Sequence, residues 1–176
     1  KMIIGMHFGN GYGSQPGAWR MAGVDPKNYV DFDSQVRYAR SAERGKLHFL
    51  FVPDFPALKG DIENEAPQIT VDPMMTLAAV ARETSRIGLV ATGTATFNEP
   101  YHLARQFKAL DLMSHGRTGW NAVPTSDPAI AANYGREIPP RLEKYARLHE
   151  SIQIVQSLWG SWEKEAWIHD PETGRF

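Results

Sequence analysis

The sequence has no cysteine and no long hydrophobic run. The lack of cysteine excludes disulfides, thiolate catalysis and zinc sites with cysteine ligands, and it is compatible with a reducing compartment, so we expect a cytoplasmic protein. The densest apolar stretch covers residues 47–52, which is far shorter than the roughly 20 residues that cross a bilayer. We therefore expect no membrane-spanning segment.

Positively and negatively charged side chains occur in nearly equal numbers. The 176 residues include 19 Lys and Arg against 20 Asp and Glu, for a net charge of −1, and they contain no basic block. A nucleic-acid surface needs clustered basic side chains that displace counterions from phosphate, so we expect no nucleic-acid partner. The 6 histidines never form an i, i+4 pair around a glutamate, and there is no acidic calcium loop, so we expect no metal site.

The sequence does contain a repeated alternation of β-rich runs with amphipathic segments. Strands are expected at residues 2–8, 47–52, 87–92 and 118–123. Helix starts are expected after them at Asp25-Pro26, Asp72-Pro73, Pro100 and Pro140, because aspartate caps a helix and proline suits its first turn. Two loops are expected, a long one on the active-site side at 53–70 and one after the fourth strand at 124–139. Because parallel neighbours need a helix-length connection, four such cycles predict an α/β fold with a parallel sheet.

Two parallel-sheet architectures compete for this pattern. One is a small open, doubly wound sheet, and the other is the first half of a (β/α)8 barrel, which needs about 250 residues in full. Length favours the open sheet. The turn after the first strand argues against the open sheet. A phosphate-binding turn must enter a helix at once, whereas Gly9-Asn10-Gly11-Tyr12-Gly13-Ser14 is followed by Gln15-Pro16-Gly17.

In a barrel, the residues at the carboxyl ends of the strands converge on one face. Here those residues are Phe8, Asp54, Thr92 and 121–123. A carboxylate directly after an apolar strand is costly unless it is hydrogen-bonded, and Asn121 can both donate and accept. Such groups suit a polar heterocycle with a hydroxylated tail, whereas the alternative for Asp54 is a loop or helix cap.

The hydroxyl-rich segment 92–96 (TGTAT) has two interpretations. It is either an anion-binding turn or a turn with polar side chains, and the residues alone do not decide between them.

Several motifs occur in the order found in one known family. They are Pro16-Gly17-Ala18-Trp19-Arg20, residues 42–46 (AERGK) leading into 49–51 and Asp54, residues 85–92 (SRIGLVAT), 98–105 (NEPYHLAR), Leu110-Asp111, 116–121 (GRTGWN) and Ser161-Trp162-Glu163. The chain resembles, from near Gly5 to Phe176, the reduced-flavin-dependent monooxygenases that act on nitrilotriacetate and dibenzothiophene sulfone, within the bacterial-luciferase-like superfamily.

This resemblance implies a fold and a reaction. The fold is a (β/α)8 TIM barrel of luciferase-like type, of which residues 1–176 form the N-terminal part, about the first four β/α units, of a single domain. The reaction is oxygenation of a small organic substrate by reduced FMN and O2, with the reduced flavin supplied by a separate NAD(P)H:flavin reductase. Members commonly form homodimers or higher oligomers.

The resemblance also carries site residues over by motif position. Asp54, Thr92 and Asn121 match flavin-contacting residues, and Tyr145 matches the tyrosine that reaches the FMN phosphate. We further expect the apolar walls of the pocket to be Phe8, Trp19 and Phe55. No catalytic residue is assigned.

The chain departs from the family pattern at a few positions. It has Ser14-Gln15 where members carry a histidine pair, Pro124 ahead of Thr125, and Pro53 ahead of the aspartate. Two alternatives therefore stay open: a deazaflavin-dependent oxidoreductase, and a non-catalytic flavin-binding half-barrel. Because a four-stranded half would expose edge strands and an apolar face, we expect the 176 residues to belong to a longer polypeptide and to be inactive alone.

Overall fold

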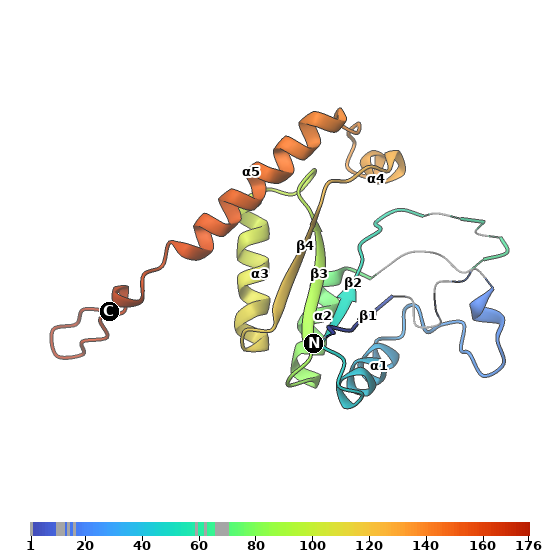
Figure 1. The fold of residues 1–176 in the computed structure, drawn as a ribbon, viewed down its shortest axis with the longest axis horizontal. Coiled ribbons are helices and arrows are strands. Elements are labelled where there is room, and N and C mark those ends of the chain that lie inside the picture. Colours follow the sequence, from blue (N-terminus) through green and yellow to red (C-terminus); the bar gives the residue numbers. More distant parts are fainter. Residues whose placement is uncertain are drawn as a thin grey trace.

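The computed structural model describes residues 2–9, 13, 15, 17–58, 60–61, 63–65 and 71–176. The strands are β1 (Gly5–His7), β2 (Phe49–Val52), β3 (Gly88–Thr94) and β4 (Thr118–Val123). The helices are α1 (Phe32–Arg44), α2 (Pro73–Glu83), α3 (Pro100–Ser114), α4 (Pro128–Asn133) and α5 (Arg141–Gly160), with short 3-10 turns η1 (Ala18–Arg20) and η2 (Lys164–Ala166). After α5, the chain runs away from the sheet to its C-terminus (Figure 1).

The strands form one parallel sheet in the order β1-β2-β3-β4, which is also their order in the chain. An open doubly wound sheet reverses direction at a switch point, so its strand order departs from the chain order. The sequential order is instead that of consecutive (β/α) units in a barrel. The α/β class and the partial TIM barrel predicted from the sequence are therefore confirmed.

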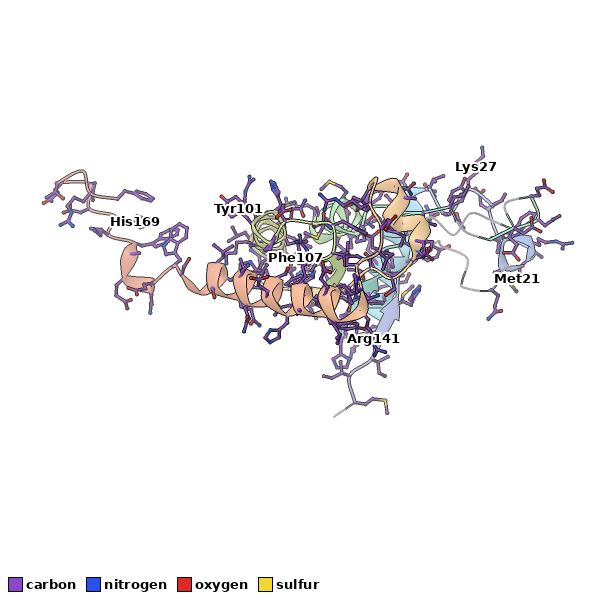
Figure 2. All side chains as sticks on the ribbon, turned by 90° about the horizontal axis from the view of Figure 1, so that it is seen from above. Met21, Lys27, Tyr101, Phe107, Arg141 and His169 are labelled. Carbon is purple, nitrogen blue, oxygen red and sulfur yellow. The ribbon has the colours of Figure 1, made fainter. Side chains whose placement is uncertain are left out.

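The core lies between one face of the sheet and helices α1, α2, α3 and α5. Alternate strand residues such as Leu50, Leu89 and Ala91 are fully buried against helix residues such as Leu77 and Phe107. Figure 2 shows Phe107 where α3 and α5 meet. Burying each large apolar side chain contributes about 1.5–3 kcal/mol, so this layer is what holds the strand ends in place.

The helix starts follow the expected capping chemistry in one case and depart from it in another. The Asp72 side chain accepts from the Met75 N–H at 2.8 Å and caps α2, as predicted. Asp25 does not start α1: its carboxylate accepts from Lys27 within a turn, and Asp31 caps the helix by accepting from two backbone N–H groups. The prediction was wrong because an Asp-Pro pair also favours turns.

A short helix, α4, lies inside the segment 124–139, which is predicted from the sequence to be a loop. Asp127 accepts from the Ala129 N–H at 2.9 Å, and Pro128 occupies the first turn. This is the same start signal as at α2, so the sequence did contain it. Among the helices of the described ranges, none is long and apolar enough to cross a membrane.

Arg117 ties the amino-terminal edge of the sheet together. Its guanidinium donates to the carbonyls of Ala81, Thr84, Ile87 and Ser114 and to the Thr84 hydroxyl, at 2.7–3.1 Å. On the same edge, burial would raise the pKa of Glu43, but three backbone N–H donors and Arg117 hold that pKa below its usual value. These contacts join the starts of β3 and β4 to α2, at the side of the sheet opposite the carboxyl ends of the strands.

Replacing Arg117 by methionine is expected to lower stability and leave ligand binding intact. The substitution orphans several carbonyl acceptors that the guanidinium satisfies, at a cost of about 2–4 kcal/mol. Urea unfolding of the complete gene product measures the loss, and Arg82→Met, on an exposed part of α2, is the matched control. A change equal to that of the control would contradict the role given to Arg117.

Candidate functional site

The carboxyl ends of the parallel strands lie along one edge of the sheet, and α4 lies on the same side of the molecule (Figure 1). Thr92 and Asn121 are paired across β3 and β4 there, and the Asn121 Nδ2 donates to the Thr92 Oγ1 at 3.0 Å. Their strand neighbours Ala91 and Trp120 belong to the helix-side core, so Thr92 and Asn121 point to the opposite face. The bond leaves the amide oxygen as an acceptor and the threonine proton as a donor for a ligand.

Asp54 comes two residues after β2, the strand next to β3. Burial, and secondarily the nearby Asp72 carboxylate, raise its pKa to about 6. Near neutral pH this carboxyl therefore changes between a pure acceptor and a group that can also donate a proton. A shifted carboxyl at the edge that carries the Thr92 and Asn121 pair is typical of a functional site.

Two aromatic residues, Phe97 after β3 and Tyr134 after α4, form a stacked pair near Asp54, which we call the aromatic wall. The Tyr134 ring stacks on Phe97 with centroids 4.8 Å apart, and Asn133 donates to the Pro56 carbonyl at 2.8 Å. Burial, then the charges of Asp54 and Asp72, raise the pKa of the Tyr134 phenol. These contacts connect the segments that follow β2, β3 and β4 near Asp54.

Threonine hydroxyls join the ends of β3 and β4 one step beyond the Thr92 and Asn121 pair. The hydroxyls of Thr94 and Thr125 are 2.7 Å apart, and Thr125 N–H donates to Thr96 Oγ1 at 2.9 Å. All three side chains are buried. Thr94 and Thr96 therefore use their hydroxyls inside the protein, which favours the interpretation of 92–96 as a turn with polar side chains.

The first turns of α5 reach the same edge. Tyr145 is half-exposed, with the Arg141 guanidinium 6.0 Å from its ring centre. Lys144 is buried and donates to the Thr125 carbonyl and the Ser126 hydroxyl, and Arg147 donates to the Ala95 carbonyl at 3.0 Å. Of the three cations on this part of α5, Lys144 and Arg147 contact the segments that follow β4 and β3, and Arg141 lies over the Tyr145 ring.

The three residues expected as apolar walls lie in different surroundings. Phe8 is 2% exposed and belongs to the helix-side core with Val52, on the face opposite Thr92. Phe55 follows Asp54 and is partly buried. Trp19 lies in η1, whose neighbour Met21 is at the end of the molecule opposite His169 (Figure 2). The roles of all three as pocket walls stay predictions.

Several residues of this edge were not found from the sequence. They are Tyr134, Phe97, Asn133, Lys144 and Arg147. The start signal at Asp127-Pro128 was available and would have placed Tyr134 at a helix end. The lysine gave no signal, because a lysine in a helical pattern is normally exposed. Ser14, one of the noted departures, lies outside the described residues.

Replacing Asp54 by asparagine is expected to stabilise the protein at pH 7.5. A raised carboxyl pKa means that ionisation disfavours folding, so the penalty is absent below pH 3.8, grows as pH rises toward 6 and is complete above it. After allowance for partial exposure, asparagine removes about 1–2 kcal/mol of penalty. Thermal unfolding of both forms at pH 5 and pH 7.5 checks this, with a smaller difference expected at pH 5. A stability gain that is equal at both values would contradict it.

Comparisons with known proteins place the chain among enzymes. The profile of the family described as luciferase-like monooxygenase matches residues 6–174. N-acetyl-S-(2-succino)cysteine monooxygenase of Bacillus subtilis (strain 168) is 40% identical over 94% of the chain. Nitrilotriacetate monooxygenase component A of Aminobacter aminovorans is 37% identical over 99% of it. The chain spans 38% and 39% of the length of these two relatives.

Solved structures show the same architecture. EDTA monooxygenase from Chelativorans sp. BNC1 superposes with a TM-score of 0.88 at 33% identity, covering 97% of this chain and 42% of its own. Riboflavin lyase, solved with modified FMN and riboflavin, gives a TM-score of 0.81 at 26% identity, covering 97% of this chain and 40% of its own.

Proposed function

The chain belongs to the luciferase-like monooxygenase family, and on that basis we propose that the complete gene product oxygenates a small organic substrate with reduced FMN and O2. The observation that carries the proposal is the Thr92 and Asn121 pair at the edge that also holds Asp54. A two-component reaction, with a separate NAD(P)H:flavin reductase, is part of the proposal. The cytoplasmic location and the homodimer or higher oligomer stay predictions from the sequence.

The side chains of this edge fit an isoalloxazine ring by their chemistry. The ring edge offers carbonyl acceptors and one N–H donor, and a site for it needs donors and acceptors side by side. Thr92 keeps a proton to donate, Asn121 keeps an amide oxygen to accept, and Asp54 can do either near pH 6. The family resemblance assigns Tyr145 to the phosphate side, and its phenol is half-exposed on α5.

When bound, reduced FMN supplies the two electrons with which one oxygen atom of O2 enters the substrate while the other leaves as water. The chain's own residues hold and shield the ring. Asn121 and Thr92 fix its orientation through hydrogen bonds that are pre-set by their own contact at 3.0 Å. Phe97 and Tyr134, which stack on each other near Asp54, would limit the access of water to that side of the ring.

Anaerobic titration of the complete gene product with reduced FMN tests the proposal. Binding of about one flavin per chain is expected, followed on admission of labelled O2 by transfer of one labelled oxygen atom to a substrate from a panel of sulfones, alkanes and aminopolycarboxylates. Absence of flavin binding would contradict the proposal. Binding with hydride transfer but no oxygen incorporation would favour an oxidoreductase of another kind, and binding with neither would favour a non-catalytic module.

A further inference from the structure

Lys144 is a buried cation that forms no ion pair with an acidic side chain of the described residues. Its side chain lies in the first turn of α5, is 9% exposed, and takes part in none of the ion pairs among the described residues. Its Nζ donates to the Ser126 hydroxyl at 2.5 Å and to the Thr125 carbonyl at 3.4 Å. A buried ammonium is costly even when neutral oxygens surround it, and an apolar side chain of similar length would avoid that cost. The cost of burying this ammonium indicates that Lys144 has a function at this position that an apolar side chain could not perform.

Both oxygens that Lys144 contacts belong to the residues directly after β4. Pro124 has no N–H, so the backbone there has one donor fewer than a normal strand end. Thr125 fastens this segment to β3 by its N–H on Thr96 and its hydroxyl on Thr94. Lys144 adds the connection on the other side, from the same segment to α5.

These contacts continue along β3 and β4 to Thr92 and Asn121, the pair expected to bind the ligand. Thr94 lies two residues after Thr92 on β3 and on the same face of the strand, and residue 125 lies four after Asn121. A ligand held by hydrogen bonds needs these side chains placed to within about 0.5 Å. Movement of the segment after β4 would shift the ends of both strands that carry the pair.

We propose that Lys144 is a positioning residue, which fixes the ends of β3 and β4, and with them Thr92 and Asn121, by holding Thr125 and Ser126 against α5. Its ammonium has three donors and can bind a carbonyl and a hydroxyl together. The lysine acts through its neighbours and does not itself need to contact the ligand. Only the identity of that ligand, FMN, rests on the proposed function.

The test compares Lys144→Met with Lys144→Arg in the complete gene product, and uses Lys108→Met as control. Lys108 is an exposed lysine in the middle of α3, paired with Asp111 at 3.7 Å. The readouts are amide hydrogen exchange at Thr96 and Thr125, the thermal midpoint without flavin, and the Kd of oxidised FMN from its fluorescence. Ser126→Ala is made alone and together with Lys144→Met.

Lys144→Met is expected to speed exchange at Thr125 by about tenfold or more and to weaken FMN binding by roughly tenfold, with Lys144→Arg restoring most of both. Ser126→Ala should add little in the Lys144→Met background, because the two residues share one contact. If Lys144→Met does not fold, Thr125→Val removes the next contact in the same chain and should speed exchange at Thr96 in the same way.

Two results would overturn the proposal. One is exchange at Thr125 and an FMN Kd that stay within about twofold of the parent. The other is an equal fall in thermal midpoint for the methionine and arginine variants with no local change in exchange, which would mean that Lys144 only fills space. Should the parent protein bind no FMN, the proposed function fails while the exchange data still decide the role of Lys144.

Discussion

Replacing Asn121 by alanine is expected to weaken the binding of FMN to the complete gene product by roughly 30- to 150-fold, equivalent to about 2–3 kcal/mol. The change removes an amide that faces the ligand side of the sheet, and it also releases the Thr92 hydroxyl from the contact at 3.0 Å that orients it. Both changes are expected to weaken hydrogen bonds to the bound ring. Thr92 is 6% exposed, so its hydroxyl has little access to water as another partner. Fluorescence titration with oxidised FMN measures the effect.

The same pair gives an internal check on this result. Thr92→Val keeps the shape of the side chain and removes its hydroxyl, so it should weaken binding by about tenfold, and the double variant should lose less than the sum of the two. Gln153→Ala, an exposed amide on α5, is the control and should bind FMN normally. Additive losses from Asn121 and Thr92 would mean that the two side chains do not act together.

Replacing Gly93 by alanine is expected to destabilise the protein by about 2–3 kcal/mol. A Cβ at this position would lie 2.9 Å from the Trp120 Nε1, 3.1 Å from Phe107 and 3.2 Å from Leu103, all in the packed layer under α3. The Trp120 indole also donates to the Gly93 carbonyl at 3.0 Å, so it cannot move away without losing that bond. Because Gly93 follows Thr92 directly, FMN binding should fall as well, by about tenfold.

Gly160 provides the matched control for this substitution. It is the last residue of α5, and a Cβ built there meets no atom within 4 Å. Gly160→Ala should therefore be neutral or stabilising, because alanine loses less backbone freedom than glycine on folding. Equal urea midpoints for Gly93→Ala and Gly160→Ala would show that the layer between β3 and α3 is looser than the structure indicates.

The sequence predicts the elements of this fold well because each carries a local signal. The apolar run at 118–123 gives β4 with the predicted ends, and Asp72 and Pro100 mark the starts of α2 and α3. The first strand is shorter than predicted, since only residues 5–7 pair with β2. Apolar character alone does not fix where pairing stops, because pairing depends on the neighbouring strand.

The candidate site is predictable only in part, because local sequence signals do not show contacts between residues far apart in the chain. The sequence predicts Asp54, Thr92 and Asn121 as site residues from their places at the carboxyl ends of parallel strands, which converge on one face, and from the family resemblance. The structure brings Thr92 and Asn121 together, and the roles of all three toward a ligand stay predictions. Lys144 and Tyr134 are not found, because their importance comes from contacts with residues far along the chain, Lys144 with Ser126 and Tyr134 with Phe97. Phe8 is predicted as a pocket wall because it ends the first strand. The alternation of side chains along that strand places it in the core on the helix side of the sheet.

A crystal structure of the complete gene product with bound FMN tests the central claim most directly. The account predicts the isoalloxazine ring within hydrogen-bond distance of Thr92 and Asn121, with the Asp54 carboxyl and the Phe97–Tyr134 wall lining the same pocket. Density for the ring at any other place on the molecule, with these side chains out of its reach, would contradict it.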